Sequence, residues 1–347
     1  MYGALLSLGF LFAAVSETPY PQSQVITRLT WDKDVLKLKD GAGDNWPIAW
    51  VDDDLQITSY GDGKGFRDGN PSLTLGFARI FGDPPDHYAE DLPSDADAPM
   101  GGGPSGIKSS GMLMVDGVLY MFVRNYKPGS SDDYTNARLA WSTNMGVNWI
   151  WADWYFSDTF GCPDFVQFGK NYQGARDDYV YIASQANDDA YKYSPDIVML
   201  RAPKDRVSDR ESYEFFAGLA SSGDPIWSSD IAERSPIFTD PQGTQRISIN
   251  YNAALRRYIL ASTHQPPGSN ATHTGALGVF DAPEPWGPWT TVYYDDYWSG
   301  DHRTYHHRFP TKWMSDDGRT MWLLFSGLDG GYYSFCLKKA NLELSAR

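Results

Sequence analysis

Short runs of apolar residues, separated by polar turn residues, recur along the whole chain and predict pairs of antiparallel strands. The first pair covers residues 46–51 and 55–60, which the acidic turn 52–54 joins. Four further pairs are predicted over 109–115 with 118–123, 164–168 with 179–183, 246–251 with 256–262, and 308–314 with 319–325. Further apolar runs follow, such as 138–142, 197–201 and 277–281, so the pattern predicts an all-β fold.

The predicted hairpins return about every 60 to 70 residues, a spacing that suits four-stranded blades with long loops. Five such units in 347 residues predict a five-bladed β-propeller, with residues 17–347 as a single catalytic domain. A last strand-like run over 334–344 would pair with an N-terminal strand within 25–38 and close the ring. The content of 15% aromatic residues, with 33 Gly and 22 Pro, is typical of many short strands joined by turns.

The first residues predict export. Residues 3–16 form an apolar segment that is too short to span a bilayer and ends in small residues, so 1–16 are predicted to be a secretory signal peptide or N-terminal leader. A positively charged start is missing, which leaves a trimmed leader or a buried strand as alternatives. We expect a secreted or periplasmic protein. With only Cys162 and Cys336, it must depend on its core, and a single bridge between them stays open.

A net charge of −15 and a pI near 4.7 argue against nucleic acid and anionic membranes as partners, since both need a positive field. A polysaccharide or oligosaccharide is the expected partner, and neutral sugars suit such an acidic surface better than charged ones. No HExxH or CxxC spacing is present, and no nucleotide or redox cofactor has support. No cofactor is therefore expected beyond a structural Ca²⁺ or Na⁺ in the central channel.

Two aspartates carry the main functional hypothesis. Asp44 and Asp62 lie nine residues either side of Asp53, so antiparallel pairing of the first hairpin brings them together at its open end. Two close carboxyl groups cannot both ionise cheaply, so one acquires a raised pKa and can act as a general acid. The other stays available as nucleophile or base, which is the pair that glycoside hydrolysis needs. A cation clamp or a strand-end cap is the alternative interpretation.

In a propeller, the ends of the innermost strands and their partners surround one rim. A mixture of acids, amides, histidines and aromatic rings there suits a carbohydrate pocket. The predicted substrate-binding residues are Asn45, Trp46, Lys108, Arg124, Asn125, Asp164, His264, His306, His307 and Arg308, with Glu233 as a third candidate acid. Gln185 and Arg246 also lie at predicted strand ends. The adjacent His306 and His307 would point to opposite faces of a strand, so we do not expect them to share one metal ion.

Two resemblances narrow this hypothesis. Residues 142–149 resemble the Asp-box turn of sialidase-like propellers, with Asn144 where Asp is usual. The blade pattern, the spacing of Asp44 and Asp62 and the segments 286–289 and 309–313 together resemble a secreted five-bladed propeller family of glycoside-hydrolase-like proteins that includes endo-D-arabinanases. In that family two aspartates of the first blade are the catalytic pair, which implies Asp44 and Asp62 here.

The histidines and basic residues of the rim leave two other functions open. In a polysaccharide lyase, a His or Tyr removes the proton beside a uronate carboxylate while a cation neutralises that carboxylate. Lys108, Arg124 or Arg308 could supply the cation. The remaining alternative is a propeller that binds sugar without cleaving it.

Overall fold

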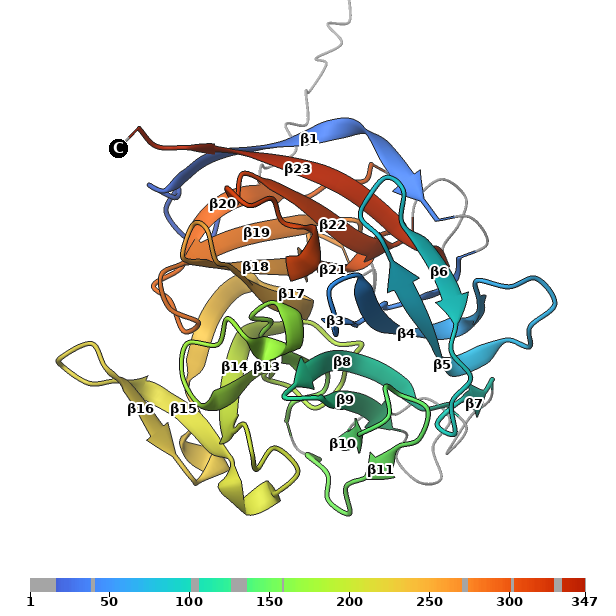
Figure 1. Cartoon of the computed structure of the whole chain (residues 1–347). Coiled ribbons are helices and arrows are strands. Elements are labelled where there is room, and N and C mark those ends of the chain that lie inside the picture. The colour runs from blue at the N-terminus through green and yellow to red at the C-terminus, as the bar shows by residue number, and fades with distance from the viewer. Residues whose placement is uncertain are drawn as a thin grey trace, which may run out of the picture.

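The computed structural model describes residues 17–38, 41–100, 106–125, 136–157, 159–269, 274–300, 303–327 and 333–346. Its sheets follow one another around the molecule in chain order, from the blue strands to the red ones (Figure 1). Strands dominate the described part and the helical segments are short 3-10 turns, which confirms the all-β prediction. No helix in those ranges is long and apolar enough to cross a membrane. The predicted signal peptide, residues 1–16, lies outside the described residues.

The described strands form four sheets. The first contains β2 (Ala42–Asp44), β3 (Ile48–Trp50), β4 (Leu55–Gly65), β5 (Leu73–Phe81), β6 (Tyr88–Asp91) and β7 (Ala98–Pro99). The second contains β8 (Lys108–Val115), β9 (Val118–Asn125), β10 (Asn136–Ser142) and β11 (Ile150–Trp151). The third contains β12 (Asp164–Phe165), β13 (Tyr179–Gln185), β14 (Ser194–Pro203), β15 (Glu214–Leu219), β16 (Pro225–Ser228), β17 (Pro236–Asn252), β18 (Arg257–His264), β19 (Leu277–Ala282) and β20 (Thr290–Asp295). The fourth contains β1 (Ile26–Lys37), β21 (Tyr305–Arg308), β22 (Thr320–Ser326) and β23 (Cys336–Leu344).

Four of the five predicted hairpins are confirmed as antiparallel pairs, namely β3 with β4, β8 with β9, β12 with β13 and β17 with β18. The fifth is confirmed only in its second strand, β22. The strand that pairs with β22 is β21, which shares only Arg308 with the predicted run 308–314, and the 3-10 turn η5 (Thr311–Trp313) follows it. Pro310 explains this end, because proline has no N–H to donate to a ladder.

The predicted pairing of the two ends of the chain is also confirmed, because β1 runs antiparallel to β23 with Leu29 opposite Leu342. The separation of the third and fourth units is not observed. Strand β17 is 17 residues long. Its first part pairs with β14 and its second part with β18, so the two units merge into one nine-stranded sheet. The count of five blades therefore stays a prediction.

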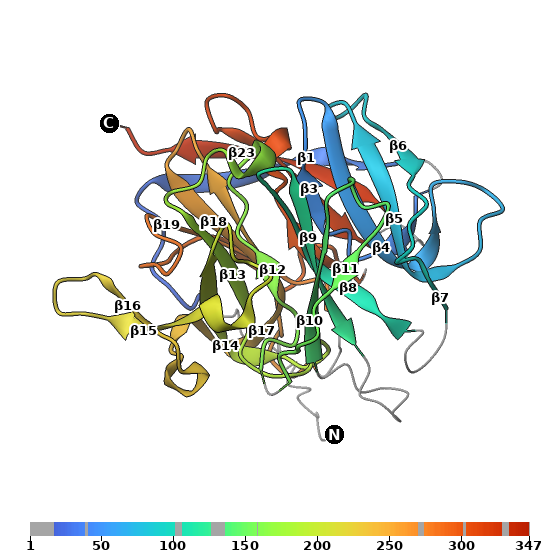
Figure 2. The ribbon, with the colours of Figure 1, turned by 60° about the horizontal axis from the view of Figure 1, so that its bottom comes forward.

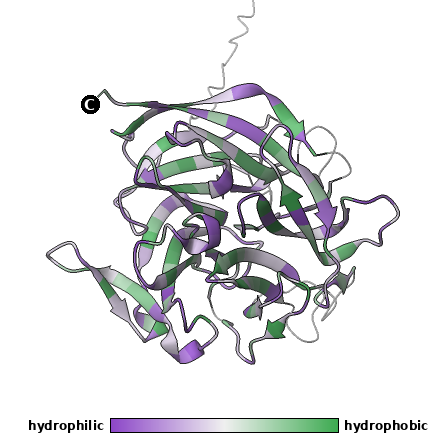
Figure 3. Ribbon diagram, in the orientation of Figure 1, coloured by the Kyte–Doolittle hydropathy of each residue, from purple (hydrophilic) through white to green (hydrophobic). Residues whose placement is uncertain are grey.

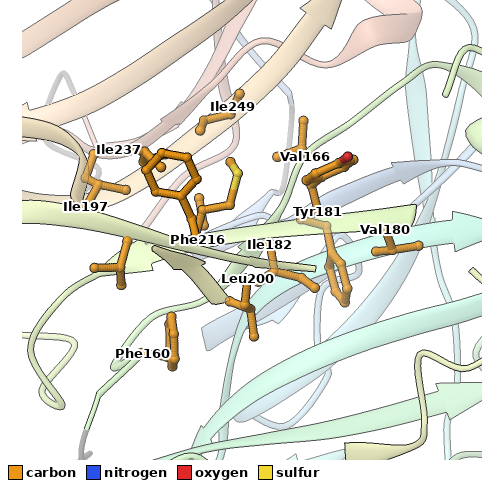
Figure 4. Close-up of a cluster of buried hydrophobic side chains, with 14 of the residues drawn as sticks. Phe160, Val166, Val180, Tyr181, Ile182, Ile197, Leu200, Phe216, Ile237 and Ile249 are labelled. Atoms are coloured by element: carbon orange, nitrogen blue, oxygen red, sulfur yellow. The ribbon is translucent and has the colours of Figure 1, made fainter. Parts of the chain in front are cut away.

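The core consists of the side chains that neighbouring sheets turn toward one another. Figure 4 shows one part of it, a cluster that includes Val180, Ile182 and Leu200 together with Ile237 and Ile249. These side chains are at most 5% exposed. Hydrophobic residues gather on the strands (Figure 3), and β8 and β19 are buried along their whole length. Strand β8 packs on both faces, because Leu113 and Val115 join one cluster and Met112 and Met114 another. Burial of this apolar surface, at about 25 cal/mol per Å², is the main favourable contribution to folding.

One element projects from this body. The hairpin of β15 and β16 extends away from the other strands in two views (Figures 1 and 2). Its tip exposes Leu219 at 50% and Ile226 at 45%. At its base, Trp227 packs edge-on against Trp286 at a ring distance of 5.9 Å. This hairpin was not predicted from the sequence.

Candidate active site

Asp44 and Asp62 lie side by side because β2 pairs with β4. Asp44 is opposite Gly61 in this ladder, one residue before Asp62. A Cβ atom at position 61 would lie 2.6 Å from Asp44 Oδ1, so only glycine leaves room for the carboxyl group. Asp62 has a φ of 48°, which distinguishes it from the regular strand residues around it. The register of β2 and β4 therefore brings the two aspartates together, as the sequence predicted. Their catalytic role stays a prediction.

Asp44 is only 6% exposed and its two oxygens are both held by donors. The Tyr305 hydroxyl donates to Oδ2 at 2.9 Å, and the Asn45 amide donates to Oδ1 at 2.7 Å. Burial raises the pKa of Asp44 above its ordinary value; Lys108 opposes this rise and Asp62 adds to it. The environment of Asp44 therefore favours the protonated carboxyl group.

Asp62 has a different environment. Its carboxylate pairs with the ammonium of Lys108, the first residue of β8. The Lys108 side chain is 5% exposed and that of Asp62 is 21% exposed. One carboxyl group of the pair is thus buried and inclined to hold a proton, while its neighbour faces a cation. Unequal environments of this kind separate an acid from a base in carboxyl pairs.

Arg246, from β17, reaches the same place from the third sheet. Its Nη1 donates to Asn45 Oδ1 at 3.4 Å. Its guanidinium also lies over the ring of Tyr305 at 5.2 Å and over the ring of Tyr191 at 4.8 Å. Asn45 and Tyr305 are the two residues that hold Asp44, so Arg246 fixes the surroundings of that carboxyl group.

Arg124, from β9, shares the Tyr191 ring with Arg246, at 5.5 Å from the ring centre. Its Nη1 lies 3.3 Å from Cys162 Sγ. The same sulfur is 3.6 Å from Nε2 of His306. Residues from β9, β21 and the segment before β12 are thereby brought into contact.

Asp164 and Arg308 form a second acid–base pair beside Cys162. Arg308 Nη1 lies 3.3 Å from Asp164 Oδ2, and both side chains are 5% exposed. Burial raises the pKa of Asp164 to about 6, although Arg308 opposes this rise. The carboxyl group of Asp164 can thus hold a proton in slightly acidic solution.

Two predicted binding residues lie elsewhere. Trp46 is 0% exposed and packs against Tyr60 and Phe335 in a hydrophobic cluster, so its ring has no face to offer a sugar. Its indole N–H donates to the carbonyl oxygen of Ser334. Glu233 ends the 3-10 turn η4 (Ile231–Glu233) at the projecting hairpin, where it is exposed and accepts a hydrogen bond from Ser228.

Two predicted histidines have their own partners. His264 Nε2 lies 2.8 Å from Asp296 Oδ1, and its ring stacks on Tyr294 at 3.8 Å. His307 contacts the hydroxyls of Thr263 and Thr304 at 3.2 and 3.1 Å. His306 and His307 therefore have different neighbours, as their adjacent positions predicted. The side chain of Asn125 lies outside the described part of the structure.

The sequence reasoning placed Arg246 at the rim but did not select Tyr191, Tyr305 or Cys162. Tyr305 directly precedes His306 and Cys162 lies two residues before Asp164, so the strand-end rule applied more widely would have found both. Tyr191 lies in the loop between β13 and β14, and no local signal indicates it.

Neither a disulfide nor a metal cluster is seen in the described part. Cys162 and Cys336 are both buried and free, which settles the question of a bridge between them. In the ranges that the structure describes, no group of three or more His, Cys, Asp or Glu side chains is placed to hold a metal ion. A structural Ca²⁺ or Na⁺ in the channel stays a prediction.

Comparison with known proteins identifies a family and a fold. Residues 65–299 match the model of a family described as "Domain of unknown function (DUF4185)". No curated protein matches the sequence. A solved structure of a candidate hydrolase from Bacteroides ovatus matches with a TM-score of 0.55 and 11% identity over 87% of this chain and 86% of that one. An N-acetylgalactosamine deacetylase from F. plautii, in complex with blood group B trisaccharide, matches with a TM-score of 0.52 and 11% identity over 94% and 96%.

A GH43_1 enzyme from Xanthomonas citri also matches, with a TM-score of 0.49 and 12% identity over 90% of this chain and 93% of that one. The two matches with TM-scores above 0.5 are only 11% identical to this chain, so their likeness shows a shared fold and no shared activity.

Proposed function

The chain belongs to the DUF4185 family, and from that premise we propose that it is a secreted or periplasmic glycoside hydrolase that cleaves a polysaccharide or oligosaccharide. The unequal carboxyl pair supports this most strongly. Burial raises the pKa of Asp44, while the adjacent Asp62 is paired with the Lys108 ammonium. These are the two states that an acid and its partner need in glycoside hydrolysis.

In this mechanism, Asp44 gives its proton to the glycosidic oxygen as the bond to the sugar breaks. The carboxylate that forms keeps the hydrogen bonds of Tyr305 and Asn45 and gains from the nearby charge of Lys108. Asp62 acts on the sugar carbon, either directly as nucleophile or by activating water. The stereochemistry of the first product, followed by NMR, distinguishes these two routes.

The substrate is a matter for a polysaccharide screen. The likeness of the Asp44 to Asp62 segment to a family that includes endo-D-arabinanases makes D-arabinan the first neutral glycan to test. Uronate-containing and sulfated glycans belong in the same screen, because the site also contains buried basic side chains.

Asp44→Asn and Asp62→Asn test the assignment. Loss of a general acid or its partner is expected to lower kcat by about 10²- to 10⁴-fold. Asp53→Asn is the matched control, because Asp53 lies in the turn of the same hairpin, where its side chain is 87% exposed and pairs with Lys170. Near-normal turnover in both site variants, on a glycan that the wild type cleaves, would refute the proposal.

A polysaccharide lyase is the second candidate, and one observation favours it. Arg124 and Arg308 are buried, and each has donors that find no acceptor among the described residues and could neutralise a uronate carboxylate. Tyr305 or His306 would then act as the base. β-Elimination produces an unsaturated sugar that absorbs ultraviolet light, whereas hydrolysis does not. Binding of a glycan without any product over long incubation would instead indicate a sugar-binding propeller.

A further inference from the structure

Within the described ranges, three arginines of the site hold N–H groups that have no hydrogen-bond acceptor. In the described structure, the donors without an acceptor are Nε and Nη2 of Arg124, Nε of Arg246, and Nε and Nη2 of Arg308. The three residues are 0%, 2% and 4% exposed. A guanidinium has five N–H donors, and leaving buried donors of a charged group unsatisfied is unfavourable.

These arginines belong to one cluster. Arg124 and Arg246 approach the same Tyr191 ring, at 5.5 and 4.8 Å. Cys162 accepts a hydrogen bond from Arg124 and also lies within electrostatic range of Arg308. We call Arg124, Arg246 and Arg308 the arginine cluster. It adjoins the catalytic pair, because the charges of Arg124 and Arg246 both act on Asp44.

The charges at this place do not balance. Lys108 and Arg124 lie directly opposite each other in the ladder of β8 and β9, where like charges repel. The four buried cations of the site face the carboxyl groups of Asp44, Asp62 and Asp164. Burial raises the pKa of Asp44 and raises that of Asp164 to about 6, which leaves even less negative charge in slightly acidic solution.

Such an arrangement does not stabilise the fold, because burying a charge without full pairing is unfavourable. Buried polar groups without partners concentrate at functional sites. A negatively charged ligand would satisfy the free donors and the excess positive charge together. Guanidinium groups suit this task, since their fork of donors matches the oxygens of carboxylates, sulfates and phosphates.

We propose that the arginine cluster binds an oxyanion substituent of the substrate glycan, a carboxylate or an ester sulfate or phosphate, beside Asp44 and Asp62. That this glycan is a substrate rests on the function proposed above, whereas the binding of an acidic sugar does not. The inference departs from the expectation of a neutral sugar, which came from the net charge of −15. A local basic site can exist on an acidic protein, because charges beyond about 10 Å are screened in ordinary salt.

Calorimetric titration with matched sugars tests the inference. Glucuronate is compared with its methyl ester, and glucose 6-sulfate and glucose 6-phosphate are compared with glucose, all at one ionic strength. At least one acidic probe is expected to bind about tenfold or more tightly than its neutral partner. Tighter binding of glucuronate than of its methyl ester identifies a site for a carboxylate. Tighter binding of glucose 6-sulfate or glucose 6-phosphate than of glucose identifies a site for a sulfate or a phosphate. No preference in any pair overturns the inference.

Arg124→Met separates a binding role from a structural one. The variant is expected to lose the acidic preference by about tenfold while binding the neutral sugar as before. Its thermal midpoint is expected to stay or to rise, because the free donors of Arg124 disappear. Arg28→Met, whose side chain is 66% exposed on β1, is the matched control and should change neither property. A lower midpoint with an intact preference would make Arg124 structural and overturn the inference.

Two further variants keep the test decisive. Arg124→Lys retains the charge without the fork and is expected to restore part of the preference; it replaces Arg124→Met if that protein does not fold. Asp62→Asn is expected to lower kcat by about 10²- to 10⁴-fold and to keep the preference for the acidic sugar. A wild type that prefers acidic sugars but cleaves no glycan refutes the hydrolase proposal alone. A wild type that cleaves glycans without any acidic preference refutes this inference alone.

Discussion

Replacing Asp44 by Asn is expected to change stability in a way that depends on pH. Burial raises the pKa of Asp44 in the folded protein above the ordinary value of 3.8. The folded state therefore binds this proton more tightly than the unfolded state. The stability that Asp44 contributes is complete below the ordinary value and is lost as the pH rises through the raised pKa. Asn cannot titrate, so the wild type should lose its advantage over Asp44→Asn as the pH rises.

The size of this effect follows from the contacts of the two oxygens. Asn has one acceptor oxygen, so Asp44→Asn keeps only one of the hydrogen bonds from Tyr305 and Asn45. This loss costs about 1 kcal/mol, and that is the difference expected near pH 4. At neutral pH, each unit by which folding raises the pKa of Asp44 removes about 1.4 kcal/mol from the stability advantage of the wild type over the variant. The difference should therefore vanish or reverse there.

Asp62→Asn is the informative contrast, because it leaves the buried ammonium of Lys108 without its carboxylate. Breaking a buried pair from one side costs about 3 to 5 kcal/mol, and the partial exposure of Asp62 places the cost toward the lower end. Urea denaturation of the three proteins between about pH 4 and pH 8 measures these differences. If the gap between wild type and Asp44→Asn widens as the pH rises, Asp44 is stabilised as a carboxylate and the reasoning fails.

Three other outcomes are expected. Burial lowers the pKa of His307 to about 3, so the stability it contributes is present above about pH 6.5 and is lost as the pH falls. Urea denaturation should show that the free energy of unfolding falls less for His307→Gln than for the wild type when the pH is lowered. An equal fall in the two proteins would contradict this. Cys162 and Cys336 are free, so two thiols should titrate after unfolding without reductant, and finding none would contradict it. Gly76→Ala places a Cβ 2.4 Å from the Tyr60 ring and should lower the free energy of unfolding by about 1 to 3 kcal/mol. An unchanged thermal midpoint would show that the ring moves aside and would contradict this prediction.

Local pattern was enough to predict most strands. The apolar runs 109–115 and 118–123 predicted β8 and β9 at nearly their observed bounds. The pattern was less informative where a long-range contact decides the outcome. Strand β17 reads locally as one arm of a hairpin, but its first part pairs with β14 and fuses two predicted units. Pro310, in turn, ended a strand that hydrophobicity alone would have extended.

The same division holds for single residues of the site. Trp46 was predicted at the rim because it begins an apolar run, yet its neighbours include Phe335, which is distant in the sequence and encloses it in the core. Glu233 was predicted as a third candidate acid, but it lies in an exposed turn after the projecting hairpin. Residue type does not reveal which face of a packed sheet a side chain will meet.

The sequence by itself determined that this chain is built of strands and that Asp44 and Asp62 meet, because strand periodicity and hairpin register are local properties. Only the tertiary structure decided what surrounds the two aspartates. The hydroxyl that holds Asp44 comes from Tyr305, 261 residues away, and Arg246 joins it across 201 residues through Asn45. Burial and the field of neighbouring charges depend on such distant contacts, and they decide which carboxyl group holds a proton and where an anion can bind.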